Sequence, residues 1–346
     1  MNFIDVCGVG NSGKGALVDL LRELDDIYVP EWSFEFDMIR VPGGLLDFRH
    51  CLVDDWSPIR SHAAYHSFLD VVNKMGHDPA PWDLIGLLAS CPQRYDRRFK
   101  GEFRSLSHEF AEKFKRGSYK SVWPYNALKE NGFIRLAKRV GRRLGYTRAL
   151  FDEVLLLDGK NFDLYAREYL ESLYRLIAPD NCKDIVFNNA FEPFNPGPGL
   201  SMVGGRQIVV TRDPRDIYVS GLNIHNVSKK DKALLGPEND GLSKSFLATD
   251  DLDLFVKRFR LYQEKLFCGT SDNVLHMQFE GLIFDYQSCV EKILDFLDID
   301  PARHVEPLTH FIPSHSKKNV GLWRQSDHKD EIKFITAELS EYLVEY

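Results

Sequence analysis

The chain has 346 residues, of which 44% are hydrophobic and 27% are charged, and its formal net charge is −7. This composition is ordinary for a folded soluble protein that is large enough to bury a sizeable core. It contains no transmembrane span, because the longest apolar runs, such as residues 154–157, are far too short. Residues 1–5 lack a basic leader, so we expect no signal peptide.

The first element is an apolar strand over residues 3–7, which runs into the loop Gly8-x-x-x-x-Gly13-Lys14 and then into leucines at helical spacing. A strand, a glycine loop and a helix in this order predict a phosphate-binding loop. Glycines leave backbone N–H groups open to an anion, the helix adds its positive N-terminus, and Lys14 adds a charge. The residues predicted to bind phosphate or sulfate are Gly10, Asn11, Ser12, Gly13, Lys14 and Gly15. Gly15 stands where a magnesium-nucleotide loop has Ser or Thr, which disfavours magnesium.

The rest of the chain alternates strands with helices. We predict strands over residues 27–30, 184–187, 207–211 and 273–277, and helices over 161–177, 251–267 and 286–297. Residues from about 55 to 178 read mainly as helices. This order predicts an α/β, P-loop-like three-layer fold with a central parallel sheet. We expect one domain over residues 1–346, with a mainly helical insertion at about 50–180.

The most specific segment follows the strand at 207–211. It reads Arg212-Asp213-Pro214-Arg215-Asp216, and Ser220 lies two turns into the next predicted helix. A guanidinium at the end of a strand and a hydroxyl on the following helix can converge on one phosphate. Alternatively, the two arginines and two aspartates form an ion-paired turn. The residues alone leave both interpretations open.

This segment resembles the 3'-phosphate-binding segment of sulfotransferases that depend on PAPS (3'-phosphoadenosine 5'-phosphosulfate). Residues 8–15, 275–282 and 317–324 resemble three other segments of that family, in the same order. The resemblance covers roughly residues 1–36 and 185–346. It implies that Arg212, Ser220, Lys317 and Lys318 bind the 3'-phosphate.

The resemblance also implies the reaction. A sulfonate group would pass from PAPS to a hydroxyl or amine acceptor by in-line displacement, leaving PAP (the 3',5'-bisphosphate nucleotide) and needing no metal. Asn11 stands where many members have a cation, so either Lys14 takes that catalytic role or the catalytic cation is elsewhere. The first candidate for the general base is Glu31, the second is Glu35, and His50 or His62 would follow the family's use of histidine.

Two other functions stay open on the sequence. One is a P-loop nucleotide kinase, because residues 154–158 look like the strand that carries the Walker B aspartate. The other is a nucleotide-binding regulator that has lost catalysis, which Asn11 keeps open. A kinase would need magnesium, whereas a regulator would bind the nucleotide without turnover.

The charge is unevenly distributed along the chain. Residues 94–148 hold 16 Lys and Arg against five acids, which leaves −18 on the remainder. In a helix, one face would carry Arg135, Lys138, Arg139 and Arg142. This basic stripe could bind phosphates, carboxylates or sulfates, or it could be an ordinary solvated face. We therefore expect a small-molecule, glycan or lipid acceptor, with anionic acceptors included, and no nucleic acid. The six scattered cysteines favour a cytoplasmic location.

Overall fold

The computed structural model describes residues 1–31, 34–80, 82–83, 86, 91–121, 125, 131–145, 152–231, 246–267 and 271–345, of which 224–231 by their backbone. They divide into two compact units. The sheet unit consists of Met1–Arg40 and Ala178–Tyr346, and the inserted unit consists of Val41–Ile177. The expectation of a single domain stays a prediction.

The sheet unit is built on a five-stranded parallel sheet with the order β2-β5-β1-β6-β7. The strands are β2 (Ile27–Tyr28), β5 (Asp184–Asn188), β1 (Asn2–Cys7), β6 (Arg206–Thr211) and β7 (Val274–Gln278). All five lie where the sequence predicts strands, so the predicted α/β fold with a central parallel sheet is confirmed. The central strand β1 precedes the glycine loop, and parallel sheets bind ligands at the carboxyl ends of such strands.

The helices of the sheet unit include those predicted over residues 251–267 and 286–297. Those that follow or flank the strands are α1 (Lys14–Leu21), η1 (Asp37–Ile39), α9 (Gly197–Val203), α10 (Pro214–Asp231), α11 (Leu252–Leu266), α12 (Phe279–Phe284) and α13 (Tyr286–Leu297). The C-terminal part adds η6 (Pro301–Arg303), α14 (Pro313–Ser316), η7 (Lys317–Asn319), η8 (Leu322–Gln325), α15 (Lys329–Glu338) and η9 (Ser340–Tyr342).

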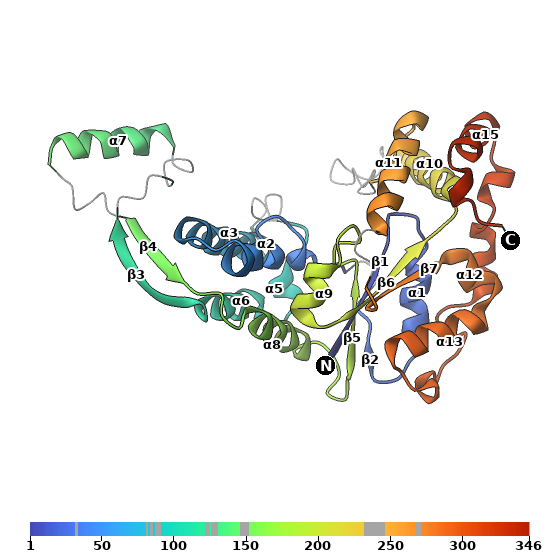
Figure 1. Ribbon diagram of the computed structural model, residues 1–346, viewed down its shortest axis with the longest axis horizontal. Helices are drawn as coiled ribbons and strands as arrows, with labels where there is room; N and C mark the ends of the chain where they lie inside the picture. The colour runs from blue at the N-terminus through green and yellow to red at the C-terminus, as the bar shows by residue number, and fades with distance from the viewer. Residues whose placement is uncertain are drawn as a thin grey trace. The chain divides into compact units, whose positions relative to one another are not determined.

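Helices cover both faces of the sheet because its strands are apolar on both sides. Ile208 and Val210 of β6 pack in one buried cluster with α1, α12 and α13. Val209, between them, packs in the other cluster with α10, α11 and α15. Alternate residues of a strand point to opposite faces, so one apolar run supplies both layers. The result is the predicted three-layer arrangement, with the sheet between the two groups of helices (Figure 1).

The inserted unit has its own core, in which aromatic rings dominate. Its elements are α2 (Leu45–Arg49), η2 (His50–Asp54), α3 (Pro58–Gly76), α5 (Tyr95–Arg98), α6 (Phe103–Glu112), β3 (Lys115–Ser121), α7 (Gly132–Arg143), β4 (Asp152–Leu157) and α8 (Phe162–Arg175). The ring of Phe110 lies 5.1 Å from that of Phe114 and 5.5 Å from that of Phe162, between centroids. Phe48 packs edge-on against all three rings. Such contacts stabilise the unit beyond simple area burial.

The sequence correctly predicts helices for much of this unit, but it misses a β-hairpin. Strands β3 and β4 pair antiparallel with each other and with no strand of the parallel sheet. Residues 154–157 belong to β4, so the interpretation of 154–158 as a Walker B segment is wrong. A Walker B strand would have to lie in the sheet that carries the glycine loop. Among the described helices, none is long and apolar enough to cross a membrane.

The aromatic core predicts a large cost for truncating its central ring. We expect Phe110→Ala to lower the free energy of unfolding by about 3–5 kcal/mol, because a side chain that is 2% exposed leaves a cavity among rings that cannot collapse. Leu164→Ala, on the exposed side of α8, is the control and should change it by less than about 0.5 kcal/mol. Chemical denaturation followed by fluorescence measures both. Equal losses would contradict the proposed core.

Candidate functional site

The glycine loop connects β1 to α1 through two left-handed residues. Asn11 has φ 68° and Gly13 has φ 88°. A Cβ on Gly13 would lie 2.3 Å from the ring of Phe279, so position 13 needs glycine for its backbone angle and for space. Ser12 N donates to Val9 O at 3.1 Å and closes the turn. Gly15 has open space where a Cβ would be, so the first turn of α1 is accessible from outside the loop.

One pocket of about 330 Å³ lies against this loop. Asn11, Gly13 and Gly15 line it on the loop side, and Arg212 and Ser220 line it on the other. The structure therefore places the two predicted phosphate-binding segments in one pocket. The helix N-terminus, a guanidinium and a hydroxyl there are groups that bind phosphate oxygens. The remaining lining residues are Ala16, Asp19, Phe279, His310, Phe311, Ile312, His315, Ser316 and Asn319.

Arg212 stands at the end of β6 and is 5% exposed. Its Nη1 donates to the carbonyl of Asn11 at 2.9 Å, and its Nη2 donates to the carbonyl of Asn319. Its guanidinium lies 5.2 Å from the centroid of the Phe279 ring. The arginine thus joins the glycine loop to the C-terminal loop while it faces the pocket.

Arg215 and Asp213 form the ion pair that the alternative interpretation expects, whereas Asp216 binds backbone N–H groups. Arg215 donates to both carboxylate oxygens of Asp213, at 2.9 and 2.6 Å. Asp216 is buried and accepts from the N–H groups of Gly321 and Trp323, at 2.7 and 3.2 Å. The Arg215 guanidinium stacks 4.0 Å from the Trp323 ring, and Trp323 packs against the core. Trp323 is therefore a structural residue of the C-terminal loop and does not line the pocket.

Behind Arg212 lies a buried carboxyl group, Glu280, at the start of α12. Its Oε1 accepts from the N–H of Asp213 at 2.9 Å, and the residue is 2% exposed. Burial raises the pKa of Glu280 to about 7, against the opposing effect of the Asp213 N–H. Glu280 therefore holds the turn after β6 and stays partly protonated near neutral pH.

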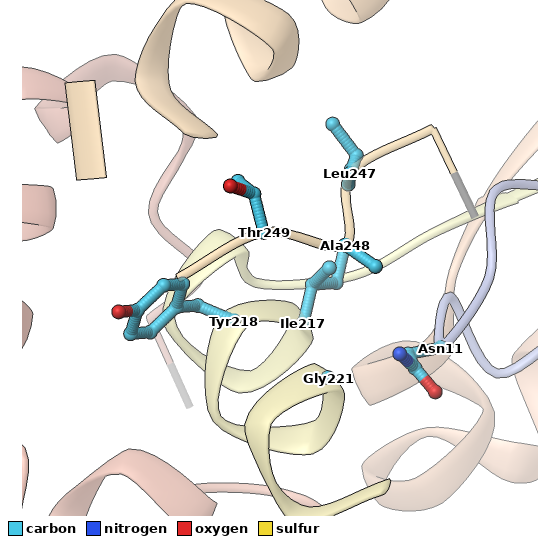
Figure 2. A pocket seen from close by; sticks show the side chains of 7 residues that line it. All are labelled: Asn11, Ile217, Tyr218, Gly221, Leu247, Ala248 and Thr249. Carbon is cyan, nitrogen blue, oxygen red and sulfur yellow. The ribbon is translucent and has the colours of Figure 1, made fainter. Parts of the chain in front are cut away.

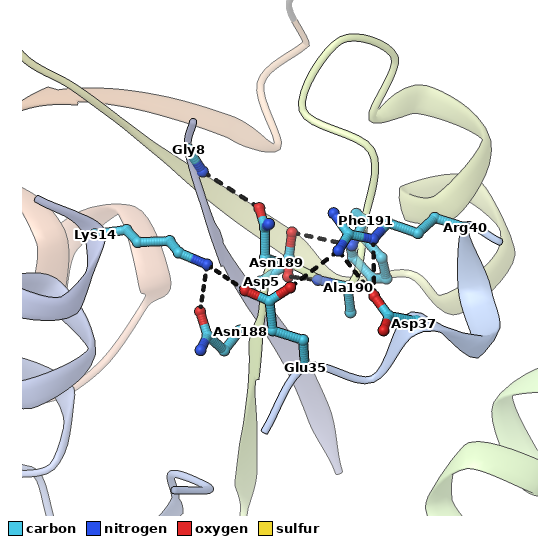
Figure 3. Close-up of polar contacts among 10 residues, drawn as sticks. All are labelled: Asp5, Gly8, Lys14, Glu35, Asp37, Arg40, Asn188, Asn189, Ala190 and Phe191. Carbon is cyan, nitrogen blue, oxygen red and sulfur yellow. Dashed lines mark hydrogen bonds and ion pairs between the residues drawn. The ribbon is translucent and has the colours of Figure 1, made fainter. Parts of the chain in front are cut away.

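A second polar cluster surrounds Lys14, which is not among the residues that line the pocket. Lys14 Nζ lies 2.8 Å from Glu35 Oε1 and 3.0 Å from Asn188 Oδ1. The other carboxylate oxygen of Glu35 accepts from Arg40 at 3.0 Å, and Arg40 also pairs with Asp37 at 2.8 Å. Figure 3 shows the Glu35 carboxylate between the two cations. A carboxylate at a partly exposed position, with its orientation fixed, can accept a proton from a substrate.

Asp5, on β1, anchors the loop that follows β5. Asp5 is fully buried on β1 and accepts from the N–H groups of Ala190 and Phe191, at 2.8 and 3.2 Å (Figure 3). Gln207 donates to it at 2.9 Å. Burial raises the pKa of Asp5 to about 6, opposed by these hydrogen bonds and by the charge of Lys14. The aspartate therefore fixes the backbone next to Asn188, which contacts Lys14.

Asn11 also lines a second, much smaller cavity on the side of α10 (Figure 2). Its volume of about 10 Å³ suits about one water molecule. The Asn11 side chain lies close to Gly221, where an added Cβ would be 3.8 Å from Nδ2. The polar side chain at position 11 therefore stands between the loop and α10.

The other predicted site residues lie as follows. Glu31 is exposed in the segment after β2, and Lys317 and Lys318 are exposed on η7. Neither lysine lines the pocket, which that segment reaches through Ser316 and Asn319. Both histidine candidates for the base lie in the inserted unit. His50 is exposed beside Asp54, whereas His62 is buried and accepts from the N–H of Leu155 at 3.1 Å.

Sequence analysis missed several residues of the site. Asn188 ends a strand adjacent to β1 in the sheet, and that position at the carboxyl end of β5 was the available signal. Phe279 packs against both Gly13 and Arg212, but an apolar residue after a strand gives no such signal. Arg40 follows Asp37 at a helical spacing of three, which predicts the ion pair with Asp37 and not the one with Glu35.

One family model matches part of the chain. Residues 205–341 match the family model described as "Sulfotransferase domain". This confirms the resemblance predicted from the sequence, and the matched part includes Arg212, Ser220 and the C-terminal loop. No curated protein matches the chain.

Similar solved structures include three proteins whose names contain the word sulfotransferase. The domain from the curacin biosynthetic pathway is 11% identical with a TM-score of 0.40, and 98% of this chain and 97% of that one are covered. The domain from the Synechococcus PCC 7002 olefin synthase is 12% identical, with a TM-score of 0.38 and coverage of 99% and 95%. Sulfotransferase STF9 from Mycobacterium avium is 15% identical, with a TM-score of 0.39 and coverage of 98% and 76%. At such low scores, the family match remains the finding on which the assignment rests.

The buried carboxyl of Glu280 predicts a pH-dependent stability. An unfolded glutamate titrates near its usual pKa of 4.5 and the native Glu280 near 7, so the native state binds more protons between these values. The free energy of unfolding should therefore fall as the pH rises through this range. Glu280→Gln keeps an oxygen acceptor for Asp213 and removes the titration. Between pH 4.5 and 8, the free energy of unfolding of the variant should rise by up to about 3 kcal/mol relative to that of the wild type.

Chemical denaturation at several pH values measures this difference. The titration of Asp5 is present in both proteins and cancels in the comparison. Parallel pH profiles of the two proteins would show that Glu280 titrates alike in the folded and unfolded chains, which contradicts the prediction.

Proposed function

We propose that this chain, a member of the sulfotransferase family by its match over residues 205–341, transfers a sulfonate group from PAPS to a hydroxyl or amine acceptor. One observation carries the proposal. A single pocket collects the glycine loop, Arg212 and Ser220, which suits a nucleotide with phosphate groups at two separate positions. Nucleotides that lack a 3'-phosphate would use only one of these two anion-binding regions.

The residues present fit such a donor. Ser12 Oγ is buried in the glycine loop and makes no hydrogen bond to any described residue, so it is a ready donor to an oxyanion. The open space at Gly15 leaves the first turn of α1 accessible to a 5'-phosphate. Arg212 and Ser220 would bind the 3'-phosphate by charge-assisted hydrogen bonds. The role assigned to Lys317 and Lys318 stays a prediction.

The cluster around Lys14 supplies the groups that the transfer requires. In an in-line displacement the acceptor oxygen or nitrogen forms a bond to sulfur, the bond from sulfur to the bridging oxygen breaks, and the 3',5'-bisphosphate nucleotide leaves. Lys14 would stabilise the negative charge that develops on the leaving phosphate. Glu35 would accept the acceptor's proton. We favour Glu35 over Glu31 as the base because Glu35 contacts Lys14 directly, at 2.8 Å.

Several finer points stay predictions. They are the small-molecule, glycan or lipid class of the acceptor, the absence of a metal and of nucleic acid from the reaction, and the cytoplasmic location. The kinase alternative is no longer supported by a Walker B segment, because β4, which contains residues 154–157, lies outside the parallel sheet. The inactive regulator remains the alternative that turnover measurements must exclude.

The donor pocket predicts selective binding of the 3'-phosphorylated nucleotide. We expect PAP to stabilise the protein against heat by mass-action linkage, and adenosine 5'-monophosphate to do so much less. Arg212→Ala should reduce the ratio of the two affinities by about 10- to 100-fold, because a hydrogen bond to a charged group is lost. Isothermal titration calorimetry measures both affinities.

Because Arg212 also joins two loops, Ser220→Ala serves as a second variant. It removes one hydroxyl from α10. It should lower the affinity for PAP and leave the affinity for adenosine 5'-monophosphate unchanged. If neither variant changes the preference for PAP, Arg212 and Ser220 do not bind the 3'-phosphate and the assignment fails.

The position of Glu35 predicts a catalytic defect without a binding defect. Glu35→Gln should lower kcat by about 10²- to 10⁴-fold, the usual effect of losing a positioned base, while PAP affinity stays within a few-fold. Asp37→Asn is the matched control, since Asp37 pairs with Arg40 and not with Lys14. Transfer from labelled PAPS to a panel of acceptors gives the rates.

Glu31→Gln should retain nearly full activity. The opposite result, an inactive Glu31 variant beside an active Glu35 variant, would show that the base is misassigned. Turnover that persists in excess EDTA would exclude the kinase alternative, and a wild-type protein that binds PAP without turnover would be the inactive regulator.

A further inference from the structure

Helix α7 carries two chemically distinct faces. At about 3.6 residues per turn, its twelve residues place Phe133, Leu136 and Val140 on one side. The other side carries all the charged residues of the helix, which are Arg135, Lys138, Arg139, Arg142 and Arg143. The helix contains no acidic residue, although the chain as a whole has a net charge of −7.

The apolar face of α7 is exposed. Phe133 is 86% exposed, Leu136 57% and Val140 48%, and no residue of the helix is buried. Leu144, which follows the helix, is 67% exposed. Large apolar side chains gathered on one helix face at such exposures mark an interaction surface, whereas single exposed ones are ordinary.

The basic face is also directed to solvent. Lys138 lies 3.5 Å from Asp152, at the start of β4. Within the described part of the chain, no acidic side chain forms an ion pair with Arg135, Arg139, Arg142 or Arg143. Several other cations of residues 94–148, the basic block, are paired, as in Lys115–Glu112 and Arg116–Asp158. The uncompensated positive charge is therefore concentrated beside the apolar face.

We propose that α7 binds in the plane of an anionic lipid bilayer, with its apolar face among the acyl chains and its arginines on the headgroup phosphates. The helix is about 18 Å long at about 1.5 Å per residue, too short to span a bilayer and suited to the interface. Anionic headgroups complement a face that bears cations alone, and the acyl region covers Phe133, Leu136 and Val140. This proposal stands independently of the sulfonate donor.

Other occupants fit the two faces less well. Nucleic acid would neutralise the arginines and leave Phe133 in water. A second copy of α7 would bury the apolar face, but it would bring two sets of cations together with no acidic residue between them. A bilayer satisfies both faces at once.

Sedimentation of the full-length chain with vesicles tests the proposal. The protein should bind vesicles of phosphatidylcholine with phosphatidylserine, and it should bind phosphatidylcholine alone at least about tenfold more weakly. Rising salt should weaken the binding, because salt screens the electrostatic attraction. Arg139→Glu with Arg142→Glu should lower the partition coefficient by about tenfold or more. Phe133→Ser should lower it by about tenfold, through lost burial of apolar surface.

Two matched variants separate α7 from general effects. Arg97→Glu with Lys100→Glu makes the same charge change at exposed positions of the basic block, and Trp82→Ser removes an aromatic side chain that is 84% exposed. Both should bind like the wild type. Binding that is equal on neutral and anionic vesicles, or that the α7 variants leave unchanged, would overturn the proposal. So would a wild-type dimer that ignores vesicles and that Phe133→Ser converts to a monomer.

Discussion

The site depends on the position of one buried guanidinium, that of Arg212. It donates to the carbonyl of Asn11 in the glycine loop and to the carbonyl of Asn319 in the C-terminal loop, segments more than 300 residues apart in the sequence. The Phe279 ring packs against it and also limits position 13 to glycine. A buried arginine must have its N–H groups satisfied, so the two loops and the arginine fix one another.

Around this arginine the side chains form two separate groups. Arg212 and Ser220 face the pocket. Lys14 and Glu35 form a separate cluster, in which Lys14 contacts one oxygen of the Glu35 carboxylate and Arg40 contacts the other. We propose that the first pair recognises the donor and that the second performs the transfer. On this proposal Lys14, which belongs to the same loop as Asn11, supplies the positive charge that the transfer requires.

Much of the fold could be predicted from the sequence, because the strands of the parallel sheet are short apolar runs bounded by clear loop signals. The hairpin β3–β4 could not, since β3 reads Lys-Arg-Gly-Ser-Tyr-Lys-Ser and has little apolar alternation. The residues of the Arg212–Asp216 segment left two interpretations open, and the structure shows that each applies to one arginine. Arg215 pairs with Asp213, and Arg212 faces the pocket. The contact between Lys14 and Glu35 joins residues 21 apart through a tertiary turn, which no local pattern predicts.

The most direct test of the central claim is a crystal structure of the protein with PAP. The account predicts that the 5'-phosphate lies against the N–H groups of the glycine loop and the start of α1, and that the 3'-phosphate lies within hydrogen-bond distance of Arg212 and Ser220. A nucleotide bound with its 3'-phosphate in solvent, or bound away from the glycine loop altogether, would contradict the account.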